Sequence, residues 1–342
     1  MEMETTSNFT QINFLPIFLL LFLFLSLPSP SIAADEMCNP GDRDALLQIK
    51  QGLNNPQSLG YWVSTRDCCF WFGVQCDDLG HVIGLTIFSR NVSGQFSPAI
   101  GNLRYLQLIR INYLSNLTGT IPPTITRLTR LTVLDLSGNK LSGHIPSFLG
   151  KLKGLRVLDL SNNLFSGSIP GSLSKLPNIV NLHLENNRLT GSIPESFGYF
   201  IGITPNLYLS KNFLSGPLPM SLGYVNFTTE IDLSCNNLTG DPTLTLFGKN
   251  KTVENVELNF NSFEFDISNV VFPDNLTTLL LDHNKIYGRL PEGLTELNLQ
   301  FFDVSDNGLC GQIPQGGTLQ TFVSNNYAHN KCLCGAPLPA CS

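Results

Sequence analysis

The nine cysteines are the residues in this chain whose chemistry is most clearly indicated by their positions. Eight fall into two groups near the ends: Cys38, Cys68, Cys69 and Cys76 in the first, and Cys310, Cys332, Cys334 and Cys341 in the second. Two even groups are typical of disulfides in a secreted chain. The adjacent residues Cys68 and Cys69 are poor partners for each other, so in each group the sequence favours sequential pairing: 38 with 68, 69 with 76, 310 with 332, and 334 with 341.

Metal binding is an alternative use of these sulfurs. Zinc sites combine cysteine and histidine at short, characteristic spacings. The five histidines, His81, His144, His183, His283 and His329, are scattered along the sequence without such spacing. We therefore expect no metal site and no cofactor, and Cys235 is expected to be an unpaired thiol.

The N-terminus carries an apolar run from Phe14 to Leu27, which is too short for a comfortable membrane span. Small residues at Ser31 and Ala33 follow it, as before a signal-peptide cleavage site. We predict a signal peptide at residues 1–33, secretion and no stable membrane anchor. Its removal takes away two acids and no base, so the formal charge changes from −6 to −4. This mildly acidic chain lacks the basic footprint of a nucleic-acid binder.

Six N-glycosylation sequons support a secreted chain. They begin at Asn91, Asn116, Asn226, Asn237, Asn250 and Asn275. A single sequon arises easily by chance, but six in a chain with disulfides predict a glycoprotein.

A repeat of 23 to 25 residues fills almost all of the remaining sequence. One glycine slot recurs at Gly94, Gly119, Gly143, Gly167, Gly191, Gly216, Gly240, Gly288 and Gly311, with Phe265 in the same place. Four residues before it stands an asparagine in eight consecutive units, Asn139, Asn163, Asn187, Asn212, Asn236, Asn261, Asn284 and Asn307. The pattern LxxLxLxxNxLxGxIP is that of a leucine-rich repeat in about ten copies.

This pattern predicts an α/β solenoid, a right-handed superhelix of plant-type repeats with a parallel sheet on its concave side. The leucines of each LxL point inward, and stacked units share one core that no unit could form alone. A column of asparagines can hydrogen-bond backbone groups that would otherwise be buried unpaired, at about 1 to 3 kcal/mol each.

Each raw end of the solenoid needs a cap. Residues 34–80 are predicted to form a cysteine-containing cap, with a helix that starts at Asn39 and Pro40 and stops at Gly52. Residues 81–314 contain the ten repeats, and residues 315–342 form the second cap.

Side chains between the inward leucines should form outward columns on neighbouring strands, about 4.8 Å apart. The central column runs Thr86, Arg110, Asp135, Asp159, His183, Tyr208, Asp232, Glu257, Leu280 and Asp303. A second column runs Ser137, Ser161, Glu185, Ser210, Ser234, Asn259, Asp282 and Ser305, and a third includes Asn162, Asn186, Lys211, Cys235, Phe260, His283 and Asp306. Such an acidic, hydroxyl-bearing wall suits a large partner with a basic surface. The alternative interpretation is that the aspartates of "LDLS" only solvate an exposed sheet.

Catalysis is poorly supported. The chain lacks GxSxG, HExxH, P-loop and GxGxxG motifs, and its Ser172/Lys175 pair falls on the convex return path. Asp135 and Asp159 could resemble a glycosidase couple, but an open sheet offers no water-excluding cleft to raise the pKa of one acid. The sequence therefore predicts a protein that is not an enzyme.

The chain resembles the plant polygalacturonase-inhibiting proteins, extracellular repeat proteins of the cell wall. The resemblance rests on "CNPGDRDALLQIKQGLNNP", "DCCFWFGVQCD", the repeats, "LCGQIPQGG" and "NKCLCGAPLPAC", and covers the mature chain. It implies a monomer that inhibits polygalacturonases of fungi or insects through its concave sheet. The positions similar to the family's binding residues are Val133, Asp135, Asp159, Ser161, His183, Glu185, Tyr208, Asp232, Glu257 and His283.

The resemblance also suggests pectin as a partner, through basic residues beside the ladder asparagines. Lys211 occupies such a position, whereas Cys235 stands where the family often has arginine. Other readings remain: a soluble receptor-like ectodomain for a peptide or oligosaccharide, an ice-binding protein with a flat Asn or Thr array, and a pectin-anchored structural protein.

Overall fold

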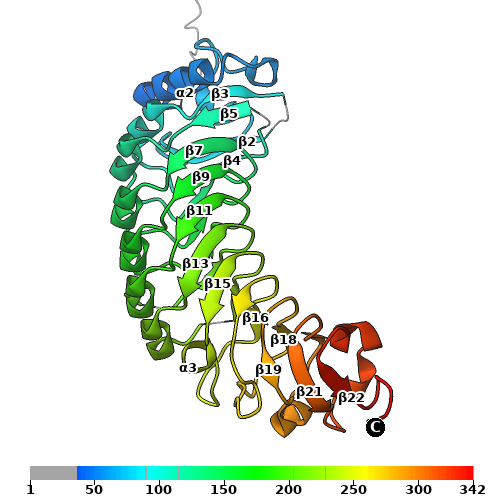
Figure 1. Ribbon diagram of the computed structural model, residues 1–342. Helices are drawn as coiled ribbons and strands as arrows, with labels where there is room; N and C mark the ends of the chain where they lie inside the picture. Colours follow the sequence, from blue (N-terminus) through cyan, green and yellow to red (C-terminus); the bar gives the residue numbers. More distant parts are fainter. Residues whose placement is uncertain (1–36, 89–90, 115, 203, 228, 342) are drawn as a thin grey trace, which may run out of the picture. The chain divides into compact units, whose positions relative to one another are not determined.

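The computed structural model describes residues 37–341, apart from residues 89–90, 115, 203 and 228. The predicted signal peptide, residues 1–33, lies outside the described residues. Residues 37–341 form a curved solenoid in which the main sheet lines the inner side and a column of short helices lines the outer side (Figure 1). No helix in the described part of the chain has the length and apolar character needed to cross a membrane.

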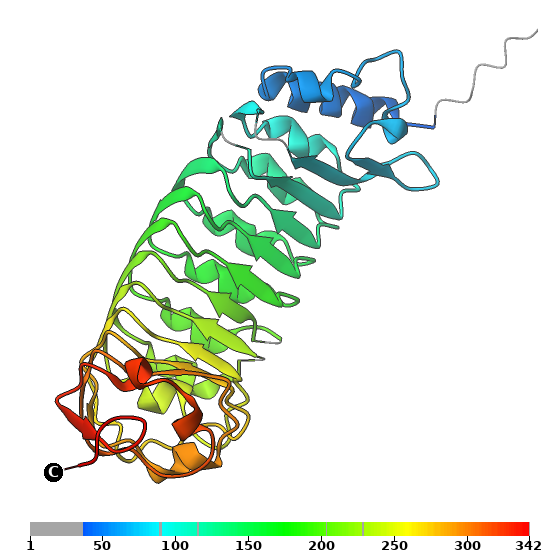
Figure 2. The same cartoon turned by 90° about the vertical axis from the view of Figure 1, so that its right-hand side faces the viewer.

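The main sheet has 11 strands, in the order β1-β2-β4-β6-β8-β10-β12-β14-β16-β18-β20. All are parallel neighbours except the antiparallel first pair. Their bounds are β1 Val74–Cys76, β2 Val82–Phe88, β4 Leu108–Asn112, β6 Val133–Asp135, β8 Val157–Asp159, β10 Asn181–His183, β12 Asn206–Tyr208, β14 Glu230–Asp232, β16 Asn255–Glu257, β18 Thr278–Leu280 and β20 Phe301–Asp303. Figure 2 shows them stacked in steps between the two ends of the solenoid.

Two smaller sheets run along the flank, where the chain leaves the asparagine and reaches the slot glycine. The first comprises β3 Ser93–Gln95, β5 Asn116–Gly119, β7 Lys140–His144, β9 Leu164–Gly167, β11 Arg188–Gly191, β13 Phe213–Pro217, β15 Asn237–Gly240 and β17 Ser262–Phe263. The second comprises β19 Tyr287–Gly288, β21 Gly308–Gln312 and β22 Cys332–Cys334. Slot glycines such as Gly143 and Gly167 have φ of 83° and 76°, which explains why the turn favours glycine.

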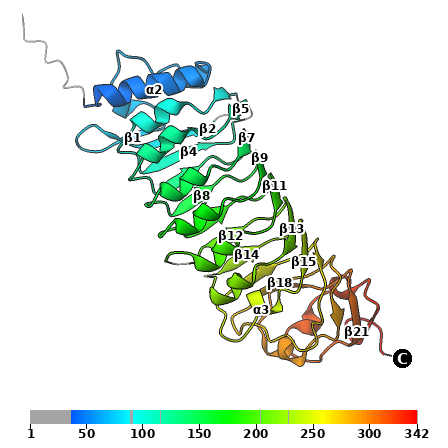
Figure 3. The same ribbon diagram turned by 60° about the vertical axis from the view of Figure 1, so that its left-hand side comes forward.

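The return path of most units contains one short helical turn, and these turns stack in a column (Figure 3); within the described residues, the unit of β16 and β17 has no helix before β18. Their bounds are η3 Pro98–Asn102, η4 Pro123–Arg127, η5 Ser147–Lys151, η6 Gly171–Lys175, η7 Glu195–Tyr199, η8 Met220–Tyr224, α3 Thr243–Leu246 and η9 Glu292–Glu296. The proline of "IP" is the residue just before the turn in units such as those of Pro122, Pro146 and Pro170, where it has extended backbone with the φ that its ring fixes. The remaining turns are η1 Gln57–Leu59, η2 Cys68–Phe70, η10 Leu319–Thr321 and η11 Ser324–Tyr327.

The asparagine column makes the hydrogen bonds expected of it. In a representative unit, Asn187 Oδ1 accepts the backbone N–H of Phe165 at 3.0 Å, and its Nδ2 donates to the carbonyls of Leu160 and Leu184 at 2.9 and 3.1 Å. The same pattern recurs in every unit from Asn139 to Asn307. These side chains therefore bond each unit to the one before it.

The C-terminal cap continues this column by one position. Asn330 Oδ1 accepts the N–H of Leu309 at 3.0 Å, and its Nδ2 donates to Val304 and Tyr327 carbonyls. Buried Tyr327 closes the core, with its hydroxyl donating to Leu319 O at 2.6 Å. The cap thus begins as an eleventh, truncated unit, which the sequence pattern did not reveal.

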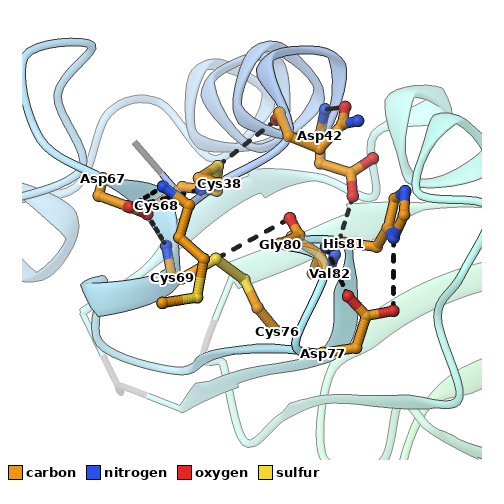
Figure 4. Close-up of a disulfide and its surroundings, with 12 residues drawn as sticks. Cys38, Asp42, Asp67, Cys68, Cys69, Cys76, Asp77, Gly80, His81 and Val82 are labelled. Atoms are coloured by element: carbon orange, nitrogen blue, oxygen red, sulfur yellow. Dashed lines mark hydrogen bonds and ion pairs between the residues drawn. A yellow bond between two sulfur atoms is a disulfide. The ribbon is translucent and has the colours of Figure 1, made fainter. Parts of the chain in front are cut away.

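The N-terminal cap is helix α2, Pro40–Gly52, whose first turn is capped by the Asn39 side chain, as predicted. Its apolar face and the stacked Trp62 and Trp71, with ring centroids 5.4 Å apart, cover the first repeat. Asp42 joins the helix to the main sheet, since its Oδ2 accepts the N–H of Val82 at 2.8 Å (Figure 4).

All four disulfides have the predicted sequential pairing, 38–68, 69–76, 310–332 and 334–341. The ligand-type atoms of Cys38, Asp67, Cys68 and Cys69 lie within 4.8 Å of one another, but the three sulfurs are in disulfides (Figure 4). Asp67 instead accepts the N–H groups of Met37 and Cys69 at 2.7 and 2.9 Å. This cluster is therefore structural: two disulfides cross-link the N-terminal cap, and Asp67 accepts backbone N–H groups beside them.

Candidate functional site

The central column lies on the concave face in the predicted order. Strand register places Thr86, Arg110, Asp135, Asp159, His183, Tyr208, Asp232, Glu257, Leu280 and Asp303 side by side, each opposite the next. Its members are half-buried, apart from exposed Arg110, because the leucines on either side of each point inward. Val133 occupies the parallel row of first strand positions, between Leu108 and Val157.

The aspartates of this column also hold the backbone in place. Asp135 Oδ1 accepts both the N–H and the hydroxyl of Ser137, at 3.0 and 2.7 Å. Asp232 and Asp303 make the same pair of bonds to Ser234 and Ser305, and Asp159 accepts the N–H of Ser161 at 2.9 Å. Each acid therefore has a local structural role in addition to its charge.

The second column differs from the prediction. Ser161 is only 3% exposed, and the equivalent serines of its column are also buried. After the third strand residue the chain turns, so the alternation that would place Ser161 on the surface no longer holds. Ser161 supports Asp159 and is not part of an exposed hydroxyl wall.

An aromatic pair lies in the middle of the face. The rings of His183 and Tyr208 stack at 4.1 Å between centroids and 5° between planes. His183 Nδ1 lies 3.4 Å from Glu185 Oε1, and the Tyr208 hydroxyl donates to Glu230 Oε2 at 2.8 Å. Glu185 Oε2 is shielded from solvent without a hydrogen-bond partner in the described part of the chain. This cluster offers flat aromatic surface surrounded by acceptors.

Burial and the neighbouring carboxylates together shift the pKa values of this face. Burial lowers the pKa of His183, whereas the hydrogen bond to Glu185 and the charges of Glu185, Asp159 and Glu230 raise it. The acids outweigh burial, so the pKa of His183 is raised. Burial and the charge of Asp135 raise the pKa of Asp159 despite its bonds to Ser161. Burial, Asp232 and Glu230 raise the pKa of Glu257 to about 7.

The acids of the central column have one arginine in the same column, Arg110, which lies opposite Asp135 in the strand register. Within the residues that the structure describes, no lysine or arginine forms an ion pair with a carboxylate of the central column. Their mutual repulsion would be relieved by a partner that brings positive charge to the face. The concave face is therefore suited to a basic protein surface with a few groups that can stack on aromatic rings.

The third column forms one rim of the concave face. Its residues all adopt left-handed backbone with φ of 53° to 55°: Asn162, Asn186, Lys211, Cys235, Phe260, His283 and Asp306. Lys211 is exposed, Cys235 is a half-buried free thiol, and His283 stacks on Phe260 with 4.0 Å between centroids. The structure thus brings Lys211 and His283 to the rim, each three residues after the central-column residue of its unit.

Glu257 predicts a pH dependence of stability. In the unfolded chain this carboxyl ionises near 4.5, whereas in the folded protein it ionises near 7. Between these values the folded state binds more protons, so its free energy of unfolding falls as pH rises. We expect Glu257→Gln to raise the free energy of unfolding, relative to wild type, by about 1 kcal/mol more at pH 8 than at pH 4.5, since solvent screens this half-exposed group. Denaturant unfolding at both pH values measures this, and equal differences would contradict it.

The six sequon asparagines are all exposed, and none lies in the main sheet. Asn116 and Asn237 begin β5 and β15 of the flank sheet, and the others lie in connecting segments. The sites predicted for glycans thus leave the strands of the concave face clear.

Two residues were not identified as part of this site from the sequence: Glu230, which accepts from Tyr208, and His329, whose Nδ1 lies 3.0 Å from Oδ1 of the rim residue Asp306. Glu230 was missed because it precedes the buried pair of its strand, although its place two residues before Asp232 puts it on the same face. His329 was missed because it lies in the cap, where the repeat pattern is no longer apparent.

Comparisons with known proteins agree with the repeat architecture. The family model "Leucine rich repeat N-terminal domain" matches residues 39–77. The models "Leucine rich repeat" and "Leucine Rich Repeat" match residues 129–189 and 275–297.

Several curated relatives are similar over nearly their whole length. "Polygalacturonase inhibitor 1" of Arabidopsis thaliana is 59% identical over 325 residues, which cover 94% of this chain and 97% of that protein. "Polygalacturonase inhibitor" of Vitis vinifera is 58% identical, with 94% and 96% covered. Among solved structures, a plant ice-binding protein superposes with a TM-score of 0.86 at 46% identity, over 90% of this chain and 99% of that one.

Proposed function

Because this chain belongs to the polygalacturonase-inhibitor family of leucine-rich repeat proteins, we propose that it binds polygalacturonases and inhibits them through its concave face. The interaction is one between proteins, and the repeat fold is a binding scaffold. The observation that carries the proposal is the central column, in which closely spaced acids form no ion pair with a lysine or arginine of the described part of the chain.

The target's chemistry supports this choice of face. An enzyme that grips a polyanion such as polygalacturonate should present positive charge around its cleft. Such a surface complements the acids of the central column, and the complementarity would both steer association and fix orientation. The stacked His183 and Tyr208 would contribute apolar contact at the centre, where interfaces are most often anchored by aromatic residues. The remaining positions that we propose to contact the enzyme are Val133, Asp135, Asp159, Glu185, Asp232, Glu257 and the rim residues Lys211 and His283.

An inhibition panel tests the proposal. Purified protein in excess should lower the rate of polygalacturonate hydrolysis by at least one fungal enzyme. Bovine serum albumin at the same concentration serves as the control for non-specific effects. A broad panel with no loss of rate would favour the soluble receptor-like reading, in which the concave face binds a peptide or oligosaccharide.

We propose secretion to the plant cell wall as a monomer, with pectin as a second partner, through a site other than the predicted rim. Exposed bases occupy the helix-to-strand turns of four successive units: Arg104, Arg127, Arg130, Lys151, Lys153, Arg156 and Lys175. The same turns, residues 98–107, 123–132, 147–156 and 171–180, contain no acid. Sedimentation with insoluble polygalacturonate should therefore be lost in Lys151→Glu/Arg156→Glu, and unchanged retention would exclude this edge.

Ice binding is the property named for the solved relative. The concave face of this chain mixes acids, aromatics and small residues, which does not match a flat, uniform Asn or Thr array. We therefore retain enzyme inhibition as the function.

A further inference from the structure

Three residues at one end of the rim occupy the same backbone position in successive units. His283, Asp306 and His329 are each separated by 23 residues, and all have left-handed backbone, with φ of 55°, 53° and 57°. Backbone hydrogen bonds hold the units in register, because His283 N donates to Ser305 O and Asp306 N donates to Ala328 O, at 3.1 and 3.0 Å. The repeat therefore delivers two imidazoles and a carboxylate to adjacent places, although they are far apart in the sequence.

Both imidazoles contact the central carboxylate, one at each of its two oxygens. His283 Nε2 lies 3.6 Å from Asp306 Oδ2, and His329 Nδ1 lies 3.0 Å from Asp306 Oδ1. Tetrahedral zinc, with bonds of about 2.0 to 2.2 Å, places its ligand atoms about 3.4 Å apart. The two measured separations lie on either side of this value, but the ligand atoms of the three residues do not all lie within 4.8 Å of one another. Binding one ion therefore requires the His329 side chain, which is 76% exposed, to rotate toward His283.

His283 is also oriented as metal-binding histidines usually are. Its Nδ1 lies 3.0 Å from Oδ2 of Asp282, a carboxylate that is largely buried, and its ring rests on Phe260. A proton on Nδ1, donated to Asp282, leaves the lone pair of Nε2 directed toward Asp306. A carboxylate behind the imidazole is the arrangement that fixes the tautomer and raises ligand basicity in zinc sites.

Solvent can reach the group. The exposed fractions of the side chains are 45% for His283, 35% for Asp306 and 76% for His329. An ion bound there would keep positions for water or for a group from a partner. With two carboxylates and two neutral imidazoles, the set also carries the charge that balances a divalent cation.

From this register and orientation, we propose that His283, Asp306 and His329 bind a divalent transition-metal ion of the zinc type, with Asp282 positioning His283. The ion would join the last two repeats to the C-terminal cap at the rim of the concave face. This site shares His283 with the rim positions proposed to contact the enzyme, but metal binding is measured without the enzyme and does not depend on inhibition. It goes beyond the sequence reading, which treated the histidines as scattered.

Calorimetric titration of the intact, chelator-treated protein with zinc chloride tests the site. We expect saturable binding of one ion per chain, and a rise in the unfolding temperature on addition of zinc. His329→Ala and Asp306→Asn should each weaken binding at least about tenfold and remove that rise, while Asp282→Asn should weaken it about 10- to 100-fold. Cobalt in place of zinc should give visible absorption bands that His329→Ala abolishes.

His144→Ala is the matched control, because His144 is also an exposed histidine but lies on β7 of the flank sheet. It should bind zinc as wild type does. The absence of saturable binding would overturn the proposal, and so would equal weakening by His144→Ala and His329→Ala. His329 is exposed enough for its alanine variant to fold, so this comparison is decisive even if Asp306→Asn is unstable.

Discussion

Replacing Asp159 and Asp232 together by asparagine should weaken inhibition of a sensitive polygalacturonase by at least about tenfold, without lowering the unfolding temperature. Two negative charges leave the centre of the concave face, and a combined loss of about 1.4 kcal/mol corresponds to tenfold in affinity. Folding should be unaffected, because asparagine Oδ1 can still accept the N–H groups of Ser161 and Ser234, now bonded at 2.9 and 3.0 Å. Inhibition constants and thermal unfolding measure the two parts.

The corresponding double alanine variant separates charge from structure. Alanine removes the acceptor as well, and each backbone N–H left without a partner costs about 1 to 3 kcal/mol. We expect this variant to inhibit weakly and also to unfold earlier. Lysine substitutions would be ambiguous for the same reason. If the asparagine variant inhibited as well as wild type at low salt, where surface charge matters most, the central column would not be the binding face.

Asn187→Ala should lower the free energy of unfolding by about 3 kcal/mol, and the unfolding temperature by about 5 °C. The side chain is 7% exposed and makes four hydrogen bonds, one accepted from Phe165 and three donated to the carbonyls of Leu160, Leu184 and Glu185. Its loss leaves the buried Phe165 N–H without a partner and weakens the link between two units. Chemical denaturation followed by circular dichroism measures the change.

The adjacent asparagine is a matched control. Asn186 is exposed, donates one hydrogen bond to Asn162 and has φ of 54°, which glycine adopts easily. Asn186→Gly should therefore change the free energy of unfolding by less than about 0.5 kcal/mol. Similar losses for the two variants would show that the buried column contributes no more than an exposed asparagine does.

Features that depend on the period of the sequence were predictable without a structure. Inward leucines, the asparagine column and the order from Thr86 to Asp303 follow from residue type and a repeat of known length. The four disulfides were predictable for another reason, because the cysteines form two even groups near the ends in which sequential pairing avoids a bond between adjacent residues. The repeated features were predictable because each is a short local pattern that recurs in every stacked unit.

Features that depend on where the strand ends were not predictable in the same way. Strict alternation would expose Ser161, but the chain turns after Asp159 and the serine is buried. The bond from Tyr208 to Glu230 joins different positions on neighbouring strands, so neither strand's own pattern indicates it. His329 comes into register with His283 only because the cap adds one more turn of the solenoid.

The strands of the main sheet are mostly three residues long, with one buried side chain between two that face the groove. Adjacent residues of one strand are thus under different constraints. The buried residue is constrained by packing, and the two outward residues are constrained by the partner that binds the face. The outward residues could therefore be substituted one at a time during evolution, as the target enzyme changes, while the hydrophobic core stays unchanged. Sequence variation among such proteins should accordingly concentrate at the first and third residues of these three-residue strands.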